Sequence, residues 1–267
     1  MKNKINITDQ TGRKINLIQP PEKIVSLVPS VTFLLYLLNL EKQTTGITRF
    51  CKYPKHWKKQ KTIVGGTKDI KIEKITQLMP EFIIANKEEN SKQTVENLEK
   101  TVPIYVSDVV DLKSNKKFVT DIGQITGKTN EAENLLKQID FLTEQLQKTK
   151  SKTYKSLYLI WREPWMSIGG DTFISHMMQV AGFENILINE QRYPVVDFKQ
   201  IKQQPEVIFL SSEPFPFKEK HKIELQKIFP QSEILLVKGE AFTWFGAYPV
   251  FGLPYLFQLY QKIKNNA

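Results

Sequence analysis

Cysteine, arginine and long apolar runs are scarce in this chain of 267 residues. Cys51 is the only cysteine, which excludes a disulfide within the chain. No stretch approaches the roughly 20 consecutive apolar residues that span a bilayer. Lysine supplies most of the formal net charge of +10 and is spread along the whole chain. Nucleic-acid readers cluster their charge and favour arginine, so we interpret the lysines as a solvated surface and expect no nucleic-acid partner.

The first residues also lack a recognisable targeting signal. Residues 1–6 carry lysines, but the apolar stretch that follows the basic residues of a signal peptide is absent. We therefore expect either a cytoplasmic protein or one whose export signal has been removed. Hydrophobic residues make up 40% of the sequence, which supports a folded core and excludes the disordered classes.

The first half of the chain alternates strand patterns and helix patterns. Residues 5–8 and 14–17 alternate apolar and polar side chains around a turn, which predicts a hairpin. Short apolar runs then alternate with segments that are apolar at helical spacing. This order is typical of an α/β fold with a mainly parallel sheet. The predicted strands are residues 23–28, 44–47, 62–66, 82–85 and 102–106, and the predicted helices are residues 32–40, 71–78 and 91–100.

A longer helical pattern occupies the middle of the chain. Gly127 is a typical helix stop, and residues 130–149 contain no glycine or proline. Such a helix is roughly 30 Å long, which is enough to bridge two lobes. A surface helix of a single domain is the alternative. The apolar residues on one face of this helix are Ala132, Leu135, Leu136, Ile139, Leu142 and Leu146.

The alternating pattern returns after this helix. Residues 156–160, 207–210 and 234–237 are predicted strands. A helix is predicted from Thr172 to the stop at Gly182, and the last helix is predicted to begin at Pro254. We therefore predict an α/β fold of two lobes with mainly parallel sheets, joined by one long rigid α-helix. The N-terminal lobe would cover residues 1–127, the connecting helix residues 128–150, and the C-terminal lobe residues 151–267.

Several segments, in order along nearly the whole chain, resemble the periplasmic binding proteins whose lobes are joined by a long backbone helix. This family includes receptors for cobalamin and for ferric siderophores. The resemblance implies a ligand cleft between the lobes and a small hinge movement, because a continuous helix has no flexible residues to bend. The matching segments are residues 24–30, 46–48, 64–66, 78–85, 102–105, 158–161, 169–174, 181–185 and 204–208.

The resemblance implies that the chain is the substrate-binding component of an ABC importer, without catalytic activity. It would bind a corrinoid or a ferric chelate, such as a siderophore or haem, as cargo and would need no cofactor of its own. A monomer is expected, in the periplasm or on the outer face of the cell membrane, with an ABC permease as partner. Such receptors dock on the permease through one acidic residue on each lobe. Acids near the expected places are Glu88, Glu89 and Glu96 in the first lobe and Glu219 and Glu224 in the second, although Lys92 occupies the nearest aligned position.

Two other functions are alternatives. The first is a cytoplasmic enzyme or chaperone on the same scaffold that handles a corrinoid or haem-like cofactor, which differs in location and partner. The second is a receptor for bare zinc or manganese, which needs several converging ligands, whereas His56, His176 and His221 lie far apart in sequence. Cys51 or His56 could still supply one axial ligand to a metal that a chelate already holds. A buried, inert thiol is the alternative for Cys51.

Aromatic residues gather directly after the predicted strands. Trp161 and Trp165 follow the strand at 156–160, and Trp244 and Phe245 follow the strand at 234–237. Two such rings can stack on the plane of a corrin or porphyrin. Packing in the core is the alternative for each ring taken alone. The proposed ligand-binding aromatics are Phe50, Trp161, Trp165, Tyr193, Trp244 and Phe245.

Polar candidates occupy the same loops. Ser30 is predicted to cap the helix after the first buried strand, which would leave backbone N–H groups free to hold an anionic or amide group. An ordinary N-cap is the alternative. Arg49, Arg162 and Arg192 lie in loops after strands, and arginine grips carboxylates in a fixed geometry, so they favour an acidic chelate. Internal salt bridges, such as one between Arg162 and Glu163, are the alternative.

Overall fold

The computed structural model describes residues 4–266, which form two compact units. Unit 1 comprises the residues up to Gln138 together with Phe245–Tyr248, and unit 2 comprises Ile139–Trp244 and the residues from Pro249 onwards. The boundary falls inside helix α6 (Thr129–Thr149), so this helix contributes to both units. The lobe boundaries expected from the sequence lie near the two ends of α6 and stay a prediction.

Unit 1 is built on a five-stranded sheet in the order β5-β4-β3-β6-β7. All neighbouring strands in it are parallel, as the alternating sequence pattern predicts. The strands β3, β6 and β7 are buried along their whole length, which explains their continuous apolar runs. The strands are β1 (Ile5–Thr8) and β2 (Lys14–Leu17), which form the predicted hairpin, and β3 (Ile24–Ser26), β4 (Thr44–Ile47), β5 (Thr62–Ile63), β6 (Phe82–Asn86) and β7 (Ile104–Ser107).

The helices of unit 1 follow the strands, and the last of them, α5, is hydrogen-bonded to a segment that is distant in sequence. Helix α5 begins at a capping box formed by Asp111 and Ser114 and ends at Gly127, whose φ of 69° suits a glycine stop. The buried amide of Asn115 donates to the carbonyl of Gly246 at 3.0 Å and accepts from its N–H at 2.5 Å. This pair places Phe245–Tyr248 in unit 1. The helices are α1 (Pro29–Leu37), α2 (Trp57–Gln60), α3 (Ile72–Leu78), α4 (Lys92–Leu98) and α5 (Leu112–Thr126).

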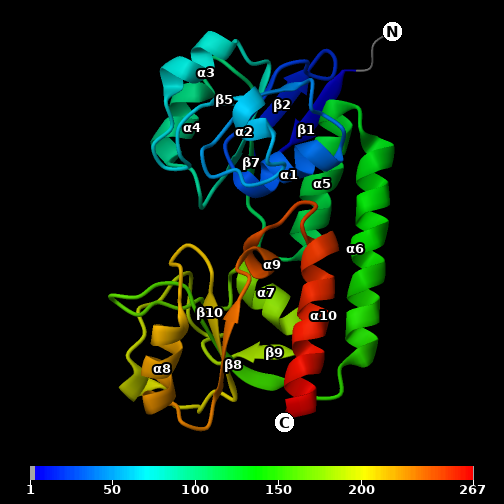
Figure 1. Ribbon diagram of the computed structural model, residues 1–267. Coiled ribbons are helices and arrows are strands. Elements are labelled where there is room, and N and C mark those ends of the chain that lie inside the picture. The colour runs from blue at the N-terminus through cyan, green and yellow to red at the C-terminus, as the bar shows by residue number, and fades with distance from the viewer. Residues whose placement is uncertain (1–3, 267) are drawn as a thin grey trace. The chain divides into compact units, whose positions relative to one another are not determined.

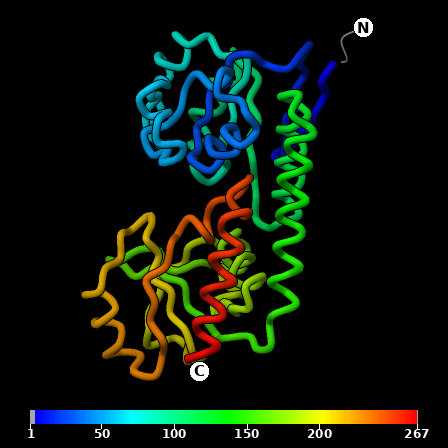
Figure 2. The backbone as a smooth tube through the Cα atoms, turned by 45° about the vertical axis from the view of Figure 1, so that its right-hand side comes forward, coloured from blue at the N-terminus to red at the C-terminus, as the bar shows by residue number. Residues whose placement is uncertain are grey.

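Unit 2 is built on a four-stranded parallel sheet in the order β11-β10-β8-β9. Leu225 of α8 is buried against one face of the sheet with Leu157 and Ile208, whereas Tyr260 of α10 packs on Tyr154. Figures 1 and 2 accordingly show α8 and α10 on opposite sides of this sheet. The elements are β8 (Tyr154–Leu159), α7 (Phe173–Val180), β9 (Phe183–Asn185), the 3-10 turn η1 (Phe198–Gln200), β10 (Val207–Ser211), α8 (Glu219–Ile228), β11 (Glu233–Val237), α9 (Glu240–Thr243) and α10 (Pro249–Asn266).

Two predicted helix starts are wrong, and proline explains both. Helix α1 begins at Pro29, so Val28 is its N-cap and Ser30 lies inside the first turn. Helix α10 begins at Pro249 and contains Pro254 in its interior. Proline lacks an N–H and suits the first helical position, so Pro29 and Pro249 fix the two starts. None of the helices in the described part of the chain is long and apolar enough to cross a membrane.

Candidate functional site

Each of the two parallel sheets reverses its strand order at one place. In unit 1 the reversal lies between β3 and β6, because β4 and β5 extend the sheet on one side and β7 extends it on the other. In unit 2 it lies between β8 and β10. Ligands of open α/β sheets bind beyond the carboxyl ends of the strands at such a reversal. We therefore take two groups of loops as candidate sites. The loops after β3, β4, β5 and β6 form what we call the carboxyl edge of unit 1. The loops after β8 and β10 form the carboxyl edge of unit 2.

The carboxyl edge of unit 2 presents a tryptophan to solvent. Trp161 follows β8 and is 41% exposed. Its ring meets that of Phe215, which follows β10, with centroids 5.6 Å apart and planes at 69°. The loop folds back on itself through hydrogen bonds between Trp161 and Met166 and between Met166 and Ile160. A partly exposed indole is thus held at the strand-order reversal, where sequence reasoning placed Trp161 but missed Phe215.

The other aromatic residue of this loop packs inward. Trp165 is partly buried against the core and stacks on Phe217, with centroids 5.8 Å apart and planes at 5°. Phe198 meets its ring at 5.3 Å. These contacts favour the core alternative for Trp165. The guanidinium of Arg162 lies 4.8 Å from the centroid of the Trp165 ring and makes a cation–π contact with it.

Arg162 is held by two carboxylates. Its Nη2 lies 2.7 Å from Glu224 Oε1 and its Nε 3.3 Å from Glu224 Oε2, which is a two-point grip from helix α8. Its Nη1 lies 2.7 Å from Glu163 Oε1. The contact with Glu163 is the bracing alternative that the sequence left open. Glu224 was missed, because it lies 62 residues further along the chain.

The carboxyl edge of unit 1 carries a matching but more exposed arrangement. Arg49, after β4, forms an ion pair with Asp69 at 2.6 Å and lies over the ring of Phe50 at 5.2 Å. The hydrogen bond from Arg49 lowers the pKa of Asp69, so the pair stays ionised at neutral pH. A side chain at Gly66 would come within 3.0 Å of Asp69, Phe50 and Arg49, so these three side chains would have to shift. Phe50 is 51% exposed and available to a ligand.

Arg192 also has an internal carboxylate partner. Its backbone N–H donates to Asp171 Oδ1 at 2.6 Å, and its Nε lies 3.3 Å from Asp171 Oδ2. Arg49, Arg162 and Arg192 are therefore all paired with acids of their own unit. These ion pairs favour the alternative of internal salt bridges for all three arginines. Tyr193, which follows Arg192, is partly buried.

The two remaining aromatic candidates are buried. Trp244 is 7% exposed, and its Nε1 donates to Glu213 Oε1 at 3.0 Å. Phe245 is buried in unit 1 against Phe118, with centroids 5.4 Å apart. These positions favour packing roles for both residues. Unit 1 has a further aromatic group, in which Phe33 of α1 meets Tyr53 at 6.0 Å and Tyr248 at 5.6 Å. Tyr53 and Tyr248 follow predicted strands, whereas sequence reasoning missed Phe33.

Ser30, Cys51 and His56 do not form a metal site among the described residues. Ser30 Oγ is buried and finds no hydrogen-bond partner among residues 4–266. Burial raises the pKa of the Cys51 thiol, which keeps it protonated and a poor metal ligand. His56 is exposed, with Nε2 3.3 Å from Glu41 Oε1. Within the described residues, no group of three or more His, Cys, Asp or Glu side chains could hold a metal ion. An axial role for Cys51 or His56 stays a prediction.

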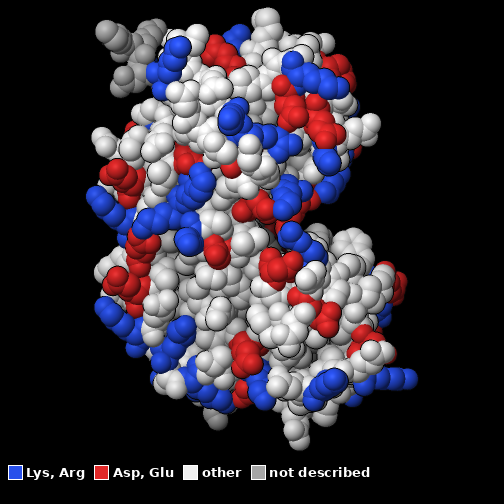
Figure 3. Space-filling view, turned by 180° about the vertical axis from the view of Figure 1, so that it is seen from behind, with Lys and Arg blue, Asp and Glu red and all other residues white. Residues whose placement is uncertain are grey.

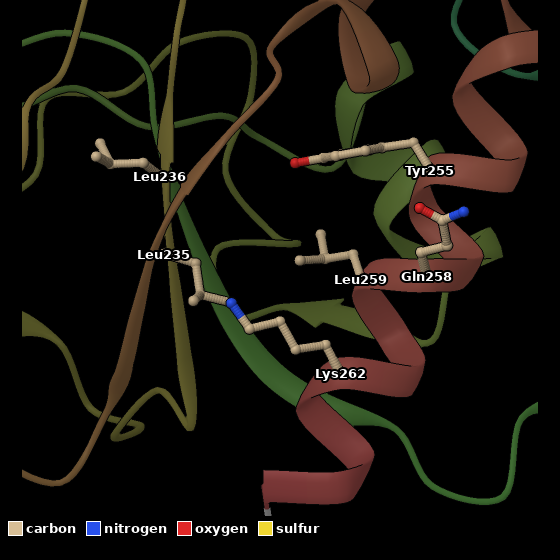
Figure 4. A pocket seen from close by; sticks show the side chains of 6 residues that line it. All are labelled: Leu235, Leu236, Tyr255, Gln258, Leu259 and Lys262. Atoms are coloured by element: carbon tan, nitrogen blue, oxygen red, sulfur yellow. The ribbon is translucent and has the colours of Figure 1, made fainter.

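A pocket of about 240 Å³ lies elsewhere in unit 2, between β11 and α10 (Figure 4). It flanks the edge strand and does not lie beyond the carboxyl ends of β8 and β10. Its volume is also below the roughly 300 Å³ at which small-molecule sites begin. We therefore do not assign it to the candidate site. Its lining residues are Leu235, Leu236, Tyr255, Gln258, Leu259 and Lys262.

Surface charge of the two signs is interspersed. On the face shown in Figure 3, lysine and arginine side chains lie among aspartate and glutamate side chains in both units. Ion pairs join surface residues of opposite sign, for example Lys87 with Asp108 at 2.5 Å and Lys152 with Glu206 at 2.6 Å. This distribution agrees with lysines that solvate the surface.

Comparison with known proteins adds a family and a fold. The sequence pattern of the family described as periplasmic binding protein matches residues 24–231. The chain is 26% identical over 215 residues to YvrC, an ABC transporter substrate-binding lipoprotein of Bacillus subtilis, covering 76% of this chain and 68% of that protein. It is 27% identical over 201 residues to a vitamin B12-binding protein of Vibrio parahaemolyticus, covering 72% of each.

Two solved structures have the same fold. The periplasmic vitamin B12 binding protein BtuF of Vibrio cholerae has a TM-score of 0.78 at 19% identity, and the match covers 92% of this chain and 98% of that one. The periplasmic heme-binding protein RhuT of Roseiflexus sp. RS-1, in apo form, has a TM-score of 0.78 at 18% identity, with 91% and 98% covered. At these identities the likeness concerns the fold.

Proposed function

Because this chain belongs to the family of periplasmic binding proteins, we propose that it is the substrate-binding component of an ABC importer. The name of its Bacillus subtilis relative supports this role. The protein binds and delivers cargo without transforming it, outside the cytoplasmic membrane, and acts as a monomer on an ABC permease. The comparisons favour this function over a cytoplasmic enzyme or chaperone, because the relatives carry the names of binding proteins.

The cargo that the site fits best is a flat metal chelate, a corrinoid or a ferric chelate such as haem. The observation that carries this proposal is Trp161, an exposed indole at the strand-order reversal of unit 2, supported from one side by Phe215. An aromatic ring in this position offers a large rigid surface to a planar ligand at little cost in side-chain entropy. Phe50 offers a second exposed ring on the carboxyl edge of unit 1.

The ion pairs of the three arginines help to choose between a corrinoid and a ferric chelate. Arg49, Arg162 and Arg192 each have an acid partner, so a ligand rich in carboxylates would have to compete with Asp69, Glu224 and Asp171. A corrinoid carries little charge apart from its phosphate, whereas haem and many ferric chelates carry carboxylates. We therefore propose a corrinoid first and a ferric chelate second, which reverses the preference drawn from the sequence. The cleft between lobes that the resemblance implies stays a prediction.

Calorimetric titration with cyanocobalamin, haemin and a ferric carboxylate siderophore tests this proposal. The expected result is one-site binding of cyanocobalamin by the wild-type protein. The variant Trp161→Ala should bind roughly 10- to 100-fold more weakly, which corresponds to a loss of about 1–3 kcal/mol. The matched control is Phe141→Ala, which removes a 60% exposed ring of α6 outside both carboxyl edges and should leave the affinity unchanged. Equal affinity in the wild type and Trp161→Ala would contradict the role of this ring.

A further inference from the structure

His221 occupies an unusual place in the first turn of α8. The residue is 6% exposed, and its ring contacts those of Phe215 and Phe217, with centroids at 5.3 and 5.4 Å. Its Nδ1 lies 2.9 Å from the backbone nitrogen of Lys218, which donates the hydrogen bond. Nδ1 therefore carries no proton in this arrangement, and the imidazole is neutral. The N-terminus of α8 thus depends on an unprotonated histidine.

The two rings beside His221 support the binding loop of unit 2. Phe215 meets Trp161 at 5.6 Å, and Phe217 stacks on Trp165 at 5.8 Å. The same helix supplies Glu224, which grips Arg162 between these two tryptophans. Helix α8 consequently holds the Trp161–Trp165 loop by aromatic packing near its first turn and by an ion pair one turn later.

The charges around His221 oppose a proton on its ring. Lys218 and Lys220 at the start of α8 and Arg162 from the loop after β8 are cations, whereas the charge of Glu224 favours protonation. Glu224 is already bonded to Arg162. Burial first, and then these cations, lower the pKa of His221. A proton on Nδ1 would also set two N–H donors, those of His221 and Lys218, against each other.

We propose that His221 is a positioning residue for the ligand-binding loop of unit 2, and that it holds Trp161 and Trp165 in place only while it is neutral. Acidification protonates the ring, breaks the hydrogen bond from Lys218 and releases Phe215 and Phe217 from their contacts. The consequence for ligand affinity rests on the proposed function, whereas the change in the loop does not. The receptor therefore loses affinity as the pH falls.

The direction of the pH effect follows from the lowered pKa. The unfolded chain takes up a proton near pH 6.5, the ordinary value for histidine, and the folded protein does so at a lower pH. The neutral ring therefore contributes its full stabilisation above about pH 6.5. That stabilisation is lost as the pH falls through the folded-state pKa of His221.

The test follows the indole N–H signals of the four tryptophans by NMR, without ligand, from about pH 7.5 to about pH 5. In the wild type the signals of Trp161 and Trp165 should move together with the titration of the His221 ring, while those of Trp57 and Trp244 stay in place. The variant His221→Gln, whose amide can accept at the helix start but cannot titrate, should abolish these movements. The control His56→Gln, in unit 1, should retain them. Movements that persist in His221→Gln would overturn the proposal.

A second variant keeps the test decisive if His221→Gln does not fold. Phe215→Leu removes the ring between His221 and Trp161 and leaves the histidine itself. The His221 ring should still titrate, while the Trp161 signal becomes insensitive to pH. A Trp161 signal that still follows the His221 titration in Phe215→Leu would contradict the proposed route.

The ligand arm uses cyanocobalamin at the two ends of this pH range. The affinity of the wild type should fall several-fold on acidification, while that of His221→Gln should stay constant. Equal losses in both proteins would overturn the link between His221 and binding. Absence of binding at either pH would contradict the proposed function instead, and the indole signals would still decide the role of His221.

Discussion

The carboxyl edges of the two units hold their loops by different chemistry. In unit 1 a buried amide does so: Asn90, after β6, donates to the carbonyl oxygens of Leu27 at 3.2 Å and Thr67 at 2.9 Å. Its own carbonyl accepts from the backbone N–H of Asn86 at 2.8 Å. One side chain therefore joins the loops after β3, β5 and β6. The Arg49–Asp69 pair of this edge lies further out, with both side chains at least half exposed.

In unit 2 the loops are held by groups whose interactions depend on salt and pH. The loop after β8 is held by the Arg162–Glu224 pair, by the ring of His221 and by three contacts between tryptophan and phenylalanine rings. Amides keep the same charge at every ordinary pH, whereas ion pairs are screened by salt and histidine titrates near neutrality. We therefore expect the loops at the carboxyl edge of unit 1 to be insensitive to pH and salt, and those at the carboxyl edge of unit 2 to respond to both.

The largest loss of stability is expected on substitution of Asn90. Asn90→Ala leaves the carbonyls of Leu27 and Thr67 and the N–H of Asn86 without their partner. Unpaired buried polar groups cost roughly 1–3 kcal/mol each, so we expect a loss of about 3 kcal/mol or more in the free energy of unfolding. Urea unfolding followed by circular dichroism measures it. The control Asn97→Ala, on the exposed face of α4, should change little, and an equally small loss in Asn90→Ala would refute the anchoring role.

A smaller effect is expected at Glu224, and it should depend on salt. Glu224→Gln removes the charge that grips Arg162 but keeps a hydrogen-bonding side chain of the same size. The pair is partly buried and has two contacts, so we expect a loss of about 1 kcal/mol at low salt that shrinks as salt is added. Glu184→Gln, on the exposed part of β9, is the matched control. A loss that does not change with salt would show that the pair acts by packing alone.

The smallest effect is expected at Arg49. Its pair with Asp69 is exposed, and such pairs contribute little to folding. Arg49→Gln should therefore unfold at the same urea concentration as the wild type. If this variant lost as much stability as Glu224→Gln, the two edges would not differ in the way described above.

Much of the fold was predictable because the signals are local. The hairpin, the parallel strands and helix α6 follow from runs of side chains within a few residues. The helix stop at Gly127 likewise depends on one residue and its φ of 69°. Helix starts were less predictable. Ser30 and Pro254 are residue types typical of a helix start, but both lie inside their helices.

The site was harder to predict because its partners are distant in sequence. Trp161 lies exposed in a loop after a strand, as its place in the sequence indicated, and its role in binding stays a prediction. Whether Arg162 faced a ligand or an acid depended on Glu224, and the capture of Gly246 in unit 1 depended on Asn115, which lies 131 residues away. No local pattern marks such pairs. Phe215 could have been found, because it follows β10 as Trp161 follows β8.

Native mass spectrometry of the protein isolated from its source cells tests the central claim most directly. The account predicts a complex of one protein chain with one corrinoid or iron chelate, whose mass includes the organic ligand and survives treatment with a strong chelator of free metal ions. A protein that carries only a bare divalent cation, which the chelator removes, would contradict the account. So would a cargo that contains no metal at all.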